Sequence, residues 1–93
     1  MARFEVILQS QPEKYYRKVD ARLAKSLEAC FKDLEENPFY IPGGKIRRLE
    51  GKSGLFRYVV GHLRVIYEID IESSRVGVLA ILPRGDVYKR LRL

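Results

Sequence analysis

The sequence predicts an α+β protein in which helices cover one face of a mainly antiparallel β-sheet. Two patterns carry this prediction. Between residues 20 and 37 the apolar residues recur at steps of three and four, as on one side of a helix. From residue 56 onward they alternate with other residues, as along strands. The predicted order is an N-terminal strand, a helical hairpin, a three-stranded antiparallel sheet and a short terminal helix.

The N-terminal strand and the first helix are predicted from local signals. Residues 4–8 are aromatic and β-branched, which favours a strand. We expect the hydroxyl of Ser10 to cap the first helix, with Pro12-Glu13 in its first turn. Tyr15 and Tyr16 give this helix the apolar side on which it packs.

The second helix has the clearest periodicity. Asp20 is expected to cap its start, and Asn37-Pro38 ends it because proline disfavours a helical residue before it. Cys30 lies on the apolar side and is expected to act as a small buried hydrophobe. That side consists of Leu23, Leu27, Cys30, Phe31 and Leu34.

Residues 39–55 are expected to form a long connection, because they are rich in glycine and show no sustained period. Long connections in small domains are often functional. This one holds a cluster of basic residues. The cluster consists of Lys45, Arg47, Arg48 and Lys52.

Residues 56–60 and 63–69 are predicted to pair as a hairpin with Gly61-His62 as its loop. Pairing outward from this loop puts Arg57 and Arg64 together on one face of the sheet. Like charges this close repel, and an anion between them would relieve the repulsion. The alternative is two solvated arginines on an open sheet face. The opposite face is expected to pack against the helices. It consists of Phe56, Tyr58, Val60, Leu63, Val65 and Tyr67.

The remainder of the chain is predicted to complete the sheet. After a turn at residues 72–74, residues 76–82 are expected to form the third strand of the antiparallel sheet. Pro83 ends this strand, and residues 86–93 are expected to form the terminal helix.

Charge is divided unevenly along the chain. Residues 1–44 hold seven Lys/Arg and seven Asp/Glu, whereas residues 45–93 hold eleven and five, so the net charge of +6 falls in the second half. A one-sided basic surface suits a polyanion, and the alternative is a generally basic soluble protein. The 93 residues suit one domain, 1–93, and the short apolar runs suggest a cytoplasmic protein without a membrane segment.

Common enzyme motifs are not found in the sequence. It has no phosphate-binding loop, no paired Ser or Cys nucleophile, and no cluster of metal ligands. We therefore expect neither a metal nor a small-molecule cofactor. Arginines, lysines and a tyrosine can still support RNA cleavage, because RNA supplies its own nucleophile, the 2′-hydroxyl.

Two segments resemble the RelE/ParE superfamily of toxins from toxin–antitoxin systems. Residues 48–51 (Arg-Leu-Glu-Gly), with 55–60 and 63–69 (Leu-Arg-Val-Ile-Tyr-Glu-Ile), are similar to the central hairpin of these toxins. Residues 81–89 (Ile-Leu-Pro-Arg-Gly-Asp-Val-Tyr-Lys) resemble their closing motif. The Glu-Glu-Asn-Pro end of the helical pair also fits, so the resemblance spans nearly the whole chain.

The resemblance implies a RelE-like, microbial RNase-type fold and an endoribonuclease that cuts mRNA on the ribosome without a metal ion and so inhibits translation. It also implies a cognate antitoxin protein as a partner, beside the ribosome and mRNA. Carried over by position, the catalytic residues are Arg57, in the place of a lysine, with Arg64, Arg84 and Tyr88. In the mechanism that this resemblance implies, the basic cluster of Lys45, Arg47, Arg48 and Lys52 is expected to grip ribosomal RNA through its phosphates, without reading the sequence.

This sequence departs from the RelE pattern in two ways. Some RelE-like chains have a second basic residue where Val59 stands here. Arginine is also a poor proton acceptor, so Arg57 leaves the general base unassigned. The ParE branch shares the fold but inhibits DNA gyrase without cutting nucleic acid, and a plain RNA-binding module is a third alternative. Three arginines together with Tyr88 favour the RelE branch.

Overall fold

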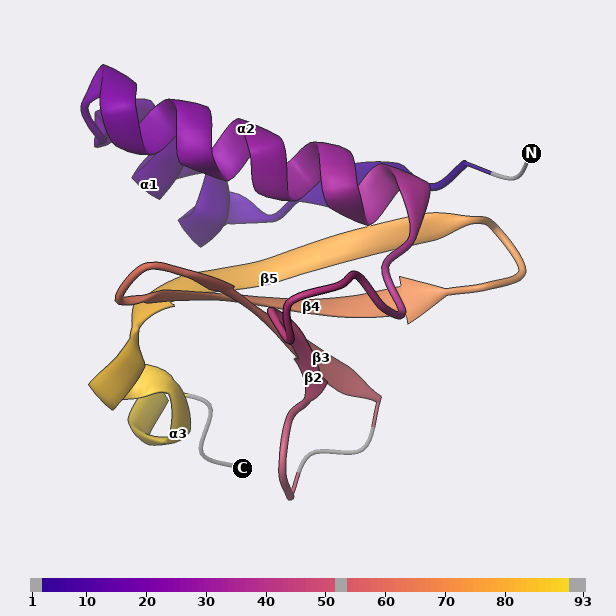
Figure 1. The fold of residues 1–93 in the computed structure, drawn as a ribbon. Helices are drawn as coiled ribbons and strands as arrows, with labels where there is room; N and C mark the ends of the chain where they lie inside the picture. The colour runs from indigo at the N-terminus through magenta and orange to yellow at the C-terminus, as the bar shows by residue number, and fades with distance from the viewer. Residues whose placement is uncertain (1–2, 52–53, 91–93) are drawn as a thin grey trace.

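The computed structural model describes residues 3–51 and 54–90, and within these residues no helix is long and apolar enough to cross a membrane. Two helices, α1 (Ser10–Lys18) and α2 (Ala21–Glu36), lie on one face of a five-stranded sheet (Figure 1). A short helical segment lies on the other side of the sheet. The other elements are β1 (Glu5–Leu8), β2 (Ile46–Arg48), β3 (Leu55–Val60), β4 (Leu63–Asp70), β5 (Arg75–Pro83), the 3₁₀ turn η1 (Arg84–Asp86) and α3 (Val87–Arg90).

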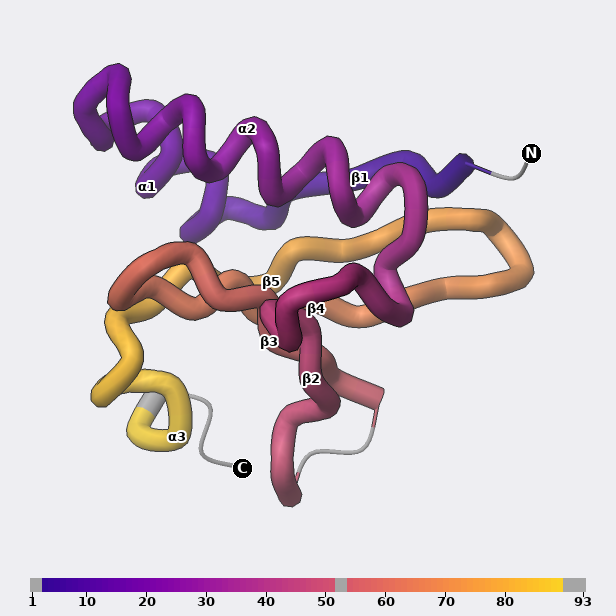
Figure 2. Tube along the Cα trace, in the orientation of Figure 1, coloured from indigo at the N-terminus to yellow at the C-terminus, as the bar shows by residue number. Residues whose placement is uncertain are grey.

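The strand order is β1-β5-β4-β3-β2, with β1 parallel to β5 and every other pair antiparallel. The predicted α+β class is confirmed, and so are the three antiparallel strands, to which β1 and β2 add the two edges. The chain passes from α2 to β2 through the segment that Figure 2 traces in magenta. The expected connection over residues 39–55 therefore contains a strand. Periodicity missed it because Ile46–Arg48 is only three residues long.

The predicted hairpin register is confirmed. Val60 pairs with Leu63 and Val59 with Arg64, so the pairs extend outward from the Gly61-His62 loop. Gly61 has φ of +58°, a left-handed conformation that glycine adopts without steric strain. The two arginines thus project from the face opposite the helices, as the alternation predicts.

The helix starts show one correct and one wrong expectation. Asp20 caps α2, its side chain accepting a hydrogen bond of 2.9 Å from the Leu23 amide. Ser10 does not cap α1, because the chain enters the helix one residue earlier, at Gln9. The Gln9 amide donates to the Val78 carbonyl at 3.0 Å, so this residue is still tied to β5 in extended conformation.

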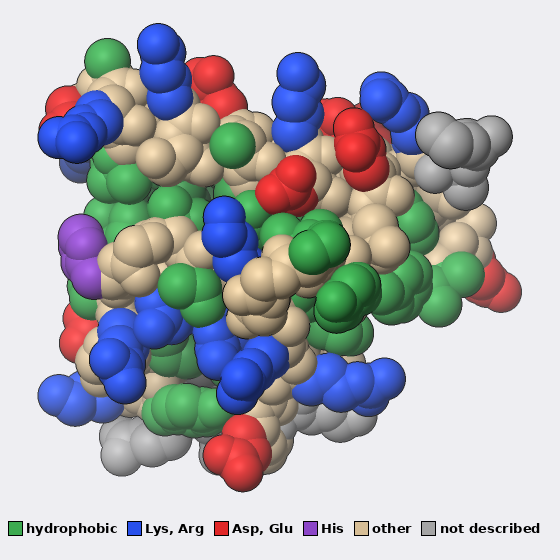
Figure 3. Space-filling view, viewed as in Figure 1, with side chains coloured by type: hydrophobic (Ala, Val, Ile, Leu, Met, Phe, Trp, Pro, Cys, Tyr) green, Lys and Arg blue, Asp and Glu red, His purple; other side chains and the backbone are tan. Residues whose placement is uncertain are grey.

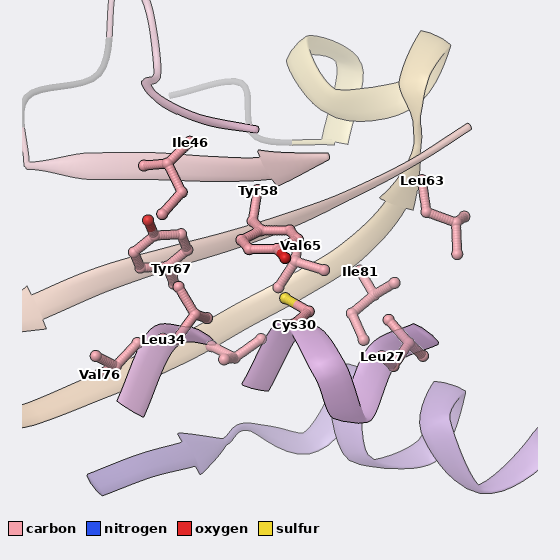
Figure 4. Close-up of a cluster of buried hydrophobic side chains, with 11 residues drawn as sticks. Leu27, Cys30, Leu34, Ile46, Tyr58, Leu63, Val65, Tyr67, Val76 and Ile81 are labelled. Atoms are coloured by element: carbon pink, nitrogen blue, oxygen red, sulfur yellow. The ribbon is translucent and has the colours of Figure 1, made fainter. Parts of the chain in front are cut away.

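The main core lies between α2 and the sheet, as Figure 4 shows. Leu27, Cys30 and Leu34 are fully buried there. Burial raises the pKa of the Cys30 thiol, so this side chain stays uncharged. Cys30 is therefore the small buried hydrophobe that the sequence predicts. The phenol of Tyr67 donates to the Pro38 carbonyl at 2.7 Å, and that of Tyr58 donates to the Asp33 carboxylate. Both bonds tie the sheet to the end of α2.

A β-bulge divides β5 into two halves. Ile66 pairs with Ala80 and Tyr67 with Val78, so Leu79 is an extra residue without a partner in β4. Val76 and Val78 face the helices and belong to the main core. On the other side of the bulge, Ala80 and Leu82 belong to a second apolar cluster, on the opposite face of the sheet.

Candidate functional site

The face opposite the helices has a small apolar floor. Ile66 of β4 is its fully buried centre. Val87, only 3% exposed, joins this floor and so fixes α3 against the sheet. The floor consists of Leu49, Ile66, Ala80, Leu82 and Val87, with Leu55 packed beside them. It is too small to be a second core, and charged side chains surround it.

All four residues predicted to be catalytic line one pocket on this face. Arg57 comes from β3, Arg64 from β4, Arg84 from η1 and Tyr88 from α3. The pocket has a volume of about 280 Å³, and Leu49 and Val87 complete its wall. Figure 3 shows Lys and Arg side chains gathered below the level of the helices. We refer to Arg57, Arg64 and Arg84 as the arginine cluster.

The hairpin loop holds two members of the arginine cluster. Nη1 of Arg64 donates to the carbonyls of Leu63 at 2.9 Å and Gly61 at 3.1 Å. The backbone amide of Arg84 donates to the His62 carbonyl at 2.8 Å. His62 is an exposed turn residue, as predicted, and contributes through its backbone. The loop therefore fixes both the guanidinium of Arg64 and the start of η1.

Arg57, which lines this pocket, has an unused hydrogen-bond donor. Its Nη1 atom is buried, yet no group in the described part of the chain accepts a hydrogen bond from it. A buried donor without an acceptor destabilises a fold by about 1–3 kcal/mol. An anion bound in the pocket would supply the acceptor.

The arginine cluster also raises the electrostatic potential of the pocket. Burial, followed by the charges of Arg57 and Arg84, lowers the pKa of the Arg64 guanidinium. Within residues 3–51 and 54–90 none of the three forms an ion pair, the observed pairs being Arg3–Glu36, Arg17–Glu13 and Arg75–Glu5. Their charge is thus available to a ligand.

Tyr88 lines this pocket and is 54% exposed. It also lines a neighbouring pocket of about 430 Å³. Its neighbour Val87 is the residue that packs α3 onto the floor. The ring of Tyr88 is therefore accessible to a ligand, and packing of the terminal helix does not require its burial.

The residues predicted to grip RNA do not all lie together. Arg47 is directly opposite Arg57 in the β2–β3 register and lines the neighbouring pocket. Arg48 borders that pocket too, but its guanidinium carbon lies 5.6 Å from the centre of the Phe56 ring, which packs against the main core. Lys45 lies 6.0 Å from the centre of the Tyr58 ring, on the helix side. Lys52 falls outside the described residues.

Three pocket residues, Leu49, Glu50 and Val87, were not singled out as site residues from the sequence. Leu49 and Glu50 follow the short strand β2, and both line the neighbouring pocket. The signal for Leu49 was an apolar residue directly after two arginines, which suggests burial. In the described chain no group of three or more His, Cys, Asp or Glu side chains could hold a metal ion.

This arrangement can bind and polarise a phosphate group. Three guanidinium groups around one pocket can donate several charge-assisted hydrogen bonds to phosphate oxygens. Such donors stabilise the extra negative charge of a phosphoryl transition state when they are held in place beforehand. An aromatic ring in the wall of the pocket offers a stacking surface for a nucleobase.

The chain resembles known toxins in sequence and in fold. The family described as the ParE toxin of the type II toxin–antitoxin system parDE matches residues 6–88. Toxin RelG of Mycobacterium tuberculosis is 37% identical over 68 residues, which cover 73% of this chain and 75% of RelG.

Solved structures extend this likeness to the whole fold. A chain of the archaeal RelE–RelB complex from Pyrococcus horikoshii superposes with a TM-score of 0.77 at 24% identity, covering 91% of this chain and 98% of that one. A chain of the toxin–antitoxin complex RelBE2 from M. tuberculosis gives a TM-score of 0.70 at 25% identity, covering 88% and 99%.

Proposed function

This chain belongs to the RelE/ParE superfamily of type II toxins, and we propose that it is an endoribonuclease that cuts mRNA on the ribosome without a metal ion. The observation that carries the proposal is the pocket that Arg57, Arg64, Arg84 and Tyr88 line together. The similarity to RelG and to RelE structures supports the RelE branch. Cleavage of mRNA would stop translation, which accounts for toxicity.

In the proposed reaction the RNA supplies the nucleophile. The 2′-oxygen attacks the adjacent phosphorus, a new P–O2′ bond forms, and the P–O5′ bond breaks. The products are a 2′,3′-cyclic phosphate and a 5′-hydroxyl, the 2′-hydroxyl losing a proton and the 5′-oxygen gaining one. The protein contributes by orienting the phosphate and by stabilising its extra charge.

Each pocket residue has a role in this scheme. Arg57 and Arg64 hold the reacting phosphate, and the free Nη1 atom of Arg57 is one of the donors. Arg84 stabilises the charge that develops in the transition state. The guanidinium groups remain protonated and cannot accept the proton of the 2′-hydroxyl. Tyr88 stacks on a base or relays a proton through its hydroxyl.

We further propose a cognate antitoxin that neutralises this chain. Related toxins were solved as complexes with RelB, in P. horikoshii and in Escherichia coli. The net charge of +6 and the uncompensated arginine cluster suit an acidic segment that folds onto the toxin. Copurification with the product of the neighbouring gene tests this, and a product that never binds would count against it.

The alternative is a ParE-like inhibitor of DNA gyrase, which the description of the matched family favours. Two assays on the purified chain separate the alternatives: primer extension on mRNA with ribosomes, and supercoiling by gyrase. We expect mRNA cleavage that persists in EDTA once ribosome integrity is controlled for. Inhibited supercoiling without any mRNA cleavage would establish the alternative. Cleavage that EDTA abolishes and Mg²⁺ restores, acting on the toxin, would contradict the metal-free mechanism.

A further inference from the structure

We propose that the pocket beside the arginine cluster is a second phosphate subsite, so that the face binds two consecutive phosphates of one RNA chain. This inference rests on the proposed function, because it names how the same site takes its substrate. The second pocket is lined by Arg47, Arg48, Leu49, Glu50, Arg57 and Tyr88. We call the first pocket the cleavage subsite and the second the flanking subsite.

The two pockets have lining residues in common. Leu49, Arg57 and Tyr88 line both of them. Arg57 can therefore donate to a phosphate on either side, while Arg64 and Arg84 serve only the cleavage subsite. Tyr88 lines both pockets and is 54% exposed, so its ring can stack on the nucleoside that joins two phosphates bound there. The arrangement thus matches the alternation of phosphate, nucleoside and phosphate.

Two cations, Arg48 and Arg47, line the flanking subsite and not the cleavage subsite, and the one that shares the face of Arg57 is Arg47. It is paired directly with Arg57, and side chains paired across strands lie on the same face. Two like charges in that position destabilise a sheet. No described residue forms an ion pair with Arg47 or Arg57 to offset this. A second phosphate, bound between the two, would neutralise the pair.

Glu50 limits how strongly the flanking subsite binds an anion. Glu50 lines that pocket and does not line the cleavage subsite. A negative charge beside a phosphate weakens the binding of that phosphate. The flanking subsite should therefore be the weaker of the two, suited to guiding the RNA chain while the cleavage subsite holds the reacting phosphate.

A nucleoside 3′,5′-bisphosphate is the smallest ligand that can fill both subsites, and it cannot be cleaved, because it lacks a phosphodiester bond. Its affinity for the whole purified chain can be compared with that of the 3′- and 5′-monophosphates by calorimetry or NMR titration. We expect the bisphosphate to bind about tenfold more tightly than either monophosphate, as one added charge-assisted contact would give.

Three variants assign this preference to the flanking subsite. Arg47→Ala should remove it and leave monophosphate binding within about twofold, and it should reduce the salt dependence of bisphosphate binding by about one phosphate contact. Glu50→Gln should strengthen bisphosphate binding severalfold. Arg22→Ala, which removes a cation on α2, controls for net charge and should keep the preference.

The outcomes separate this inference from the proposed function. Equal binding of bisphosphate and monophosphates would overturn the flanking subsite, and so would equal losses in Arg47→Ala and Arg22→Ala, even if mRNA is cleaved. An Arg47-dependent preference in a protein that cleaves no mRNA would support the subsite and reject the proposed reaction. Circular dichroism spectra that match the wild type would show that Arg47→Ala is folded.

Discussion

The two faces of the β3–β4 hairpin use the same backbone in opposite ways. On the helix side Tyr58 and Tyr67 are buried, and each phenol has a hydrogen-bond acceptor. On the other side Arg57 and Arg64 project together, and Arg57 keeps a buried donor that no described group satisfies. The first face contributes stability. The second gives some stability up and presents charge to a ligand. Of two neighbouring residues along one strand, one can therefore stabilise the fold while the next is positioned to bind a ligand.

The first prediction tests whether the helix-side face is the one that contributes stability. Leu34→Ala removes a fully buried side chain from the main core and should lower the free energy of unfolding by about 2–5 kcal/mol. Urea denaturation measures this change. The rate of mRNA cleavage per folded molecule should stay the same. Lys32→Ala, on the exposed side of the same helix, should change stability by no more than about 0.5 kcal/mol.

The second prediction removes charge from the opposite face. Arg64→Ala should lower mRNA cleavage by about 10²–10³-fold, the loss typical of one preorganised donor, and should relieve growth arrest. Its stability should change little, because the loss of the two hydrogen bonds to the loop carbonyls is offset by the removal of repulsion with Arg57 and Arg84. Arg75→Ala, at the far end of β5, serves as the control. A folded Arg64→Ala protein that is as toxic and cuts mRNA as before would refute the assignment.

Tyr88 tests whether the aromatic ring or the hydroxyl matters in the pocket. If stacking dominates, Tyr88→Phe keeps most cleavage and Tyr88→Ala loses about 10–100-fold, equivalent to about 1–3 kcal/mol. If the hydroxyl moves a proton, the Phe variant loses as much as the Ala variant, in the range of about 10²–10⁴. Single-turnover cleavage assays distinguish these results. Wild-type rates in both variants would remove Tyr88 from the site.

The smallest expected effect tests whether like charges on the face of the arginine cluster lower the free energy of unfolding. Arg47→Thr removes the like-charge pair with Arg57 and places a residue with high strand propensity in β2. It should raise the free energy of unfolding by about 0.2–1 kcal/mol at low ionic strength. The charge-dependent part of the gain should shrink in 1 M salt, where the screening length is about 3 Å. A loss of stability at low salt would contradict this account.

Much of the fold could be predicted because its signals are local. The pairing of Val59 with Arg64 follows from the two-residue loop alone, and the face of each arginine follows from alternation. The N-cap of α2 is also a local feature, because the Asp20 side chain accepts a hydrogen bond from the backbone amide of Leu23, only three residues later. The wrong cap at Ser10 has the opposite origin. A contact with β5, remote in sequence, holds Gln9 extended and moves the helix start.

The candidate site was harder to delimit than the fold. Arg57, Arg64, Arg84 and Tyr88 meet in one pocket, as their motifs imply. The basic cluster was predicted as one group because its members are adjacent in sequence. The structure divides it. β2 places Arg47 on the face of the arginine cluster, and Arg48 lines the same pocket with its guanidinium beside the Phe56 ring. Lys45 instead lies over the Tyr58 ring of the main core. A strand of three residues leaves too little periodicity to predict that division.

The β-bulge in β5 has a consequence for insertions and deletions. Because Leu79 has no partner in β4, deleting it would leave Val78 and Ala80 as neighbours on opposite faces, where they already are. Deleting any paired residue of β4 or β5 would instead move every later side chain of that strand to the other face. Position 79 is therefore a place where chain length can change by one without exchanging the apolar and charged faces. The position of Arg84, just after β5, therefore depends on the number of paired residues before it, and the unpaired Leu79 does not count toward that number.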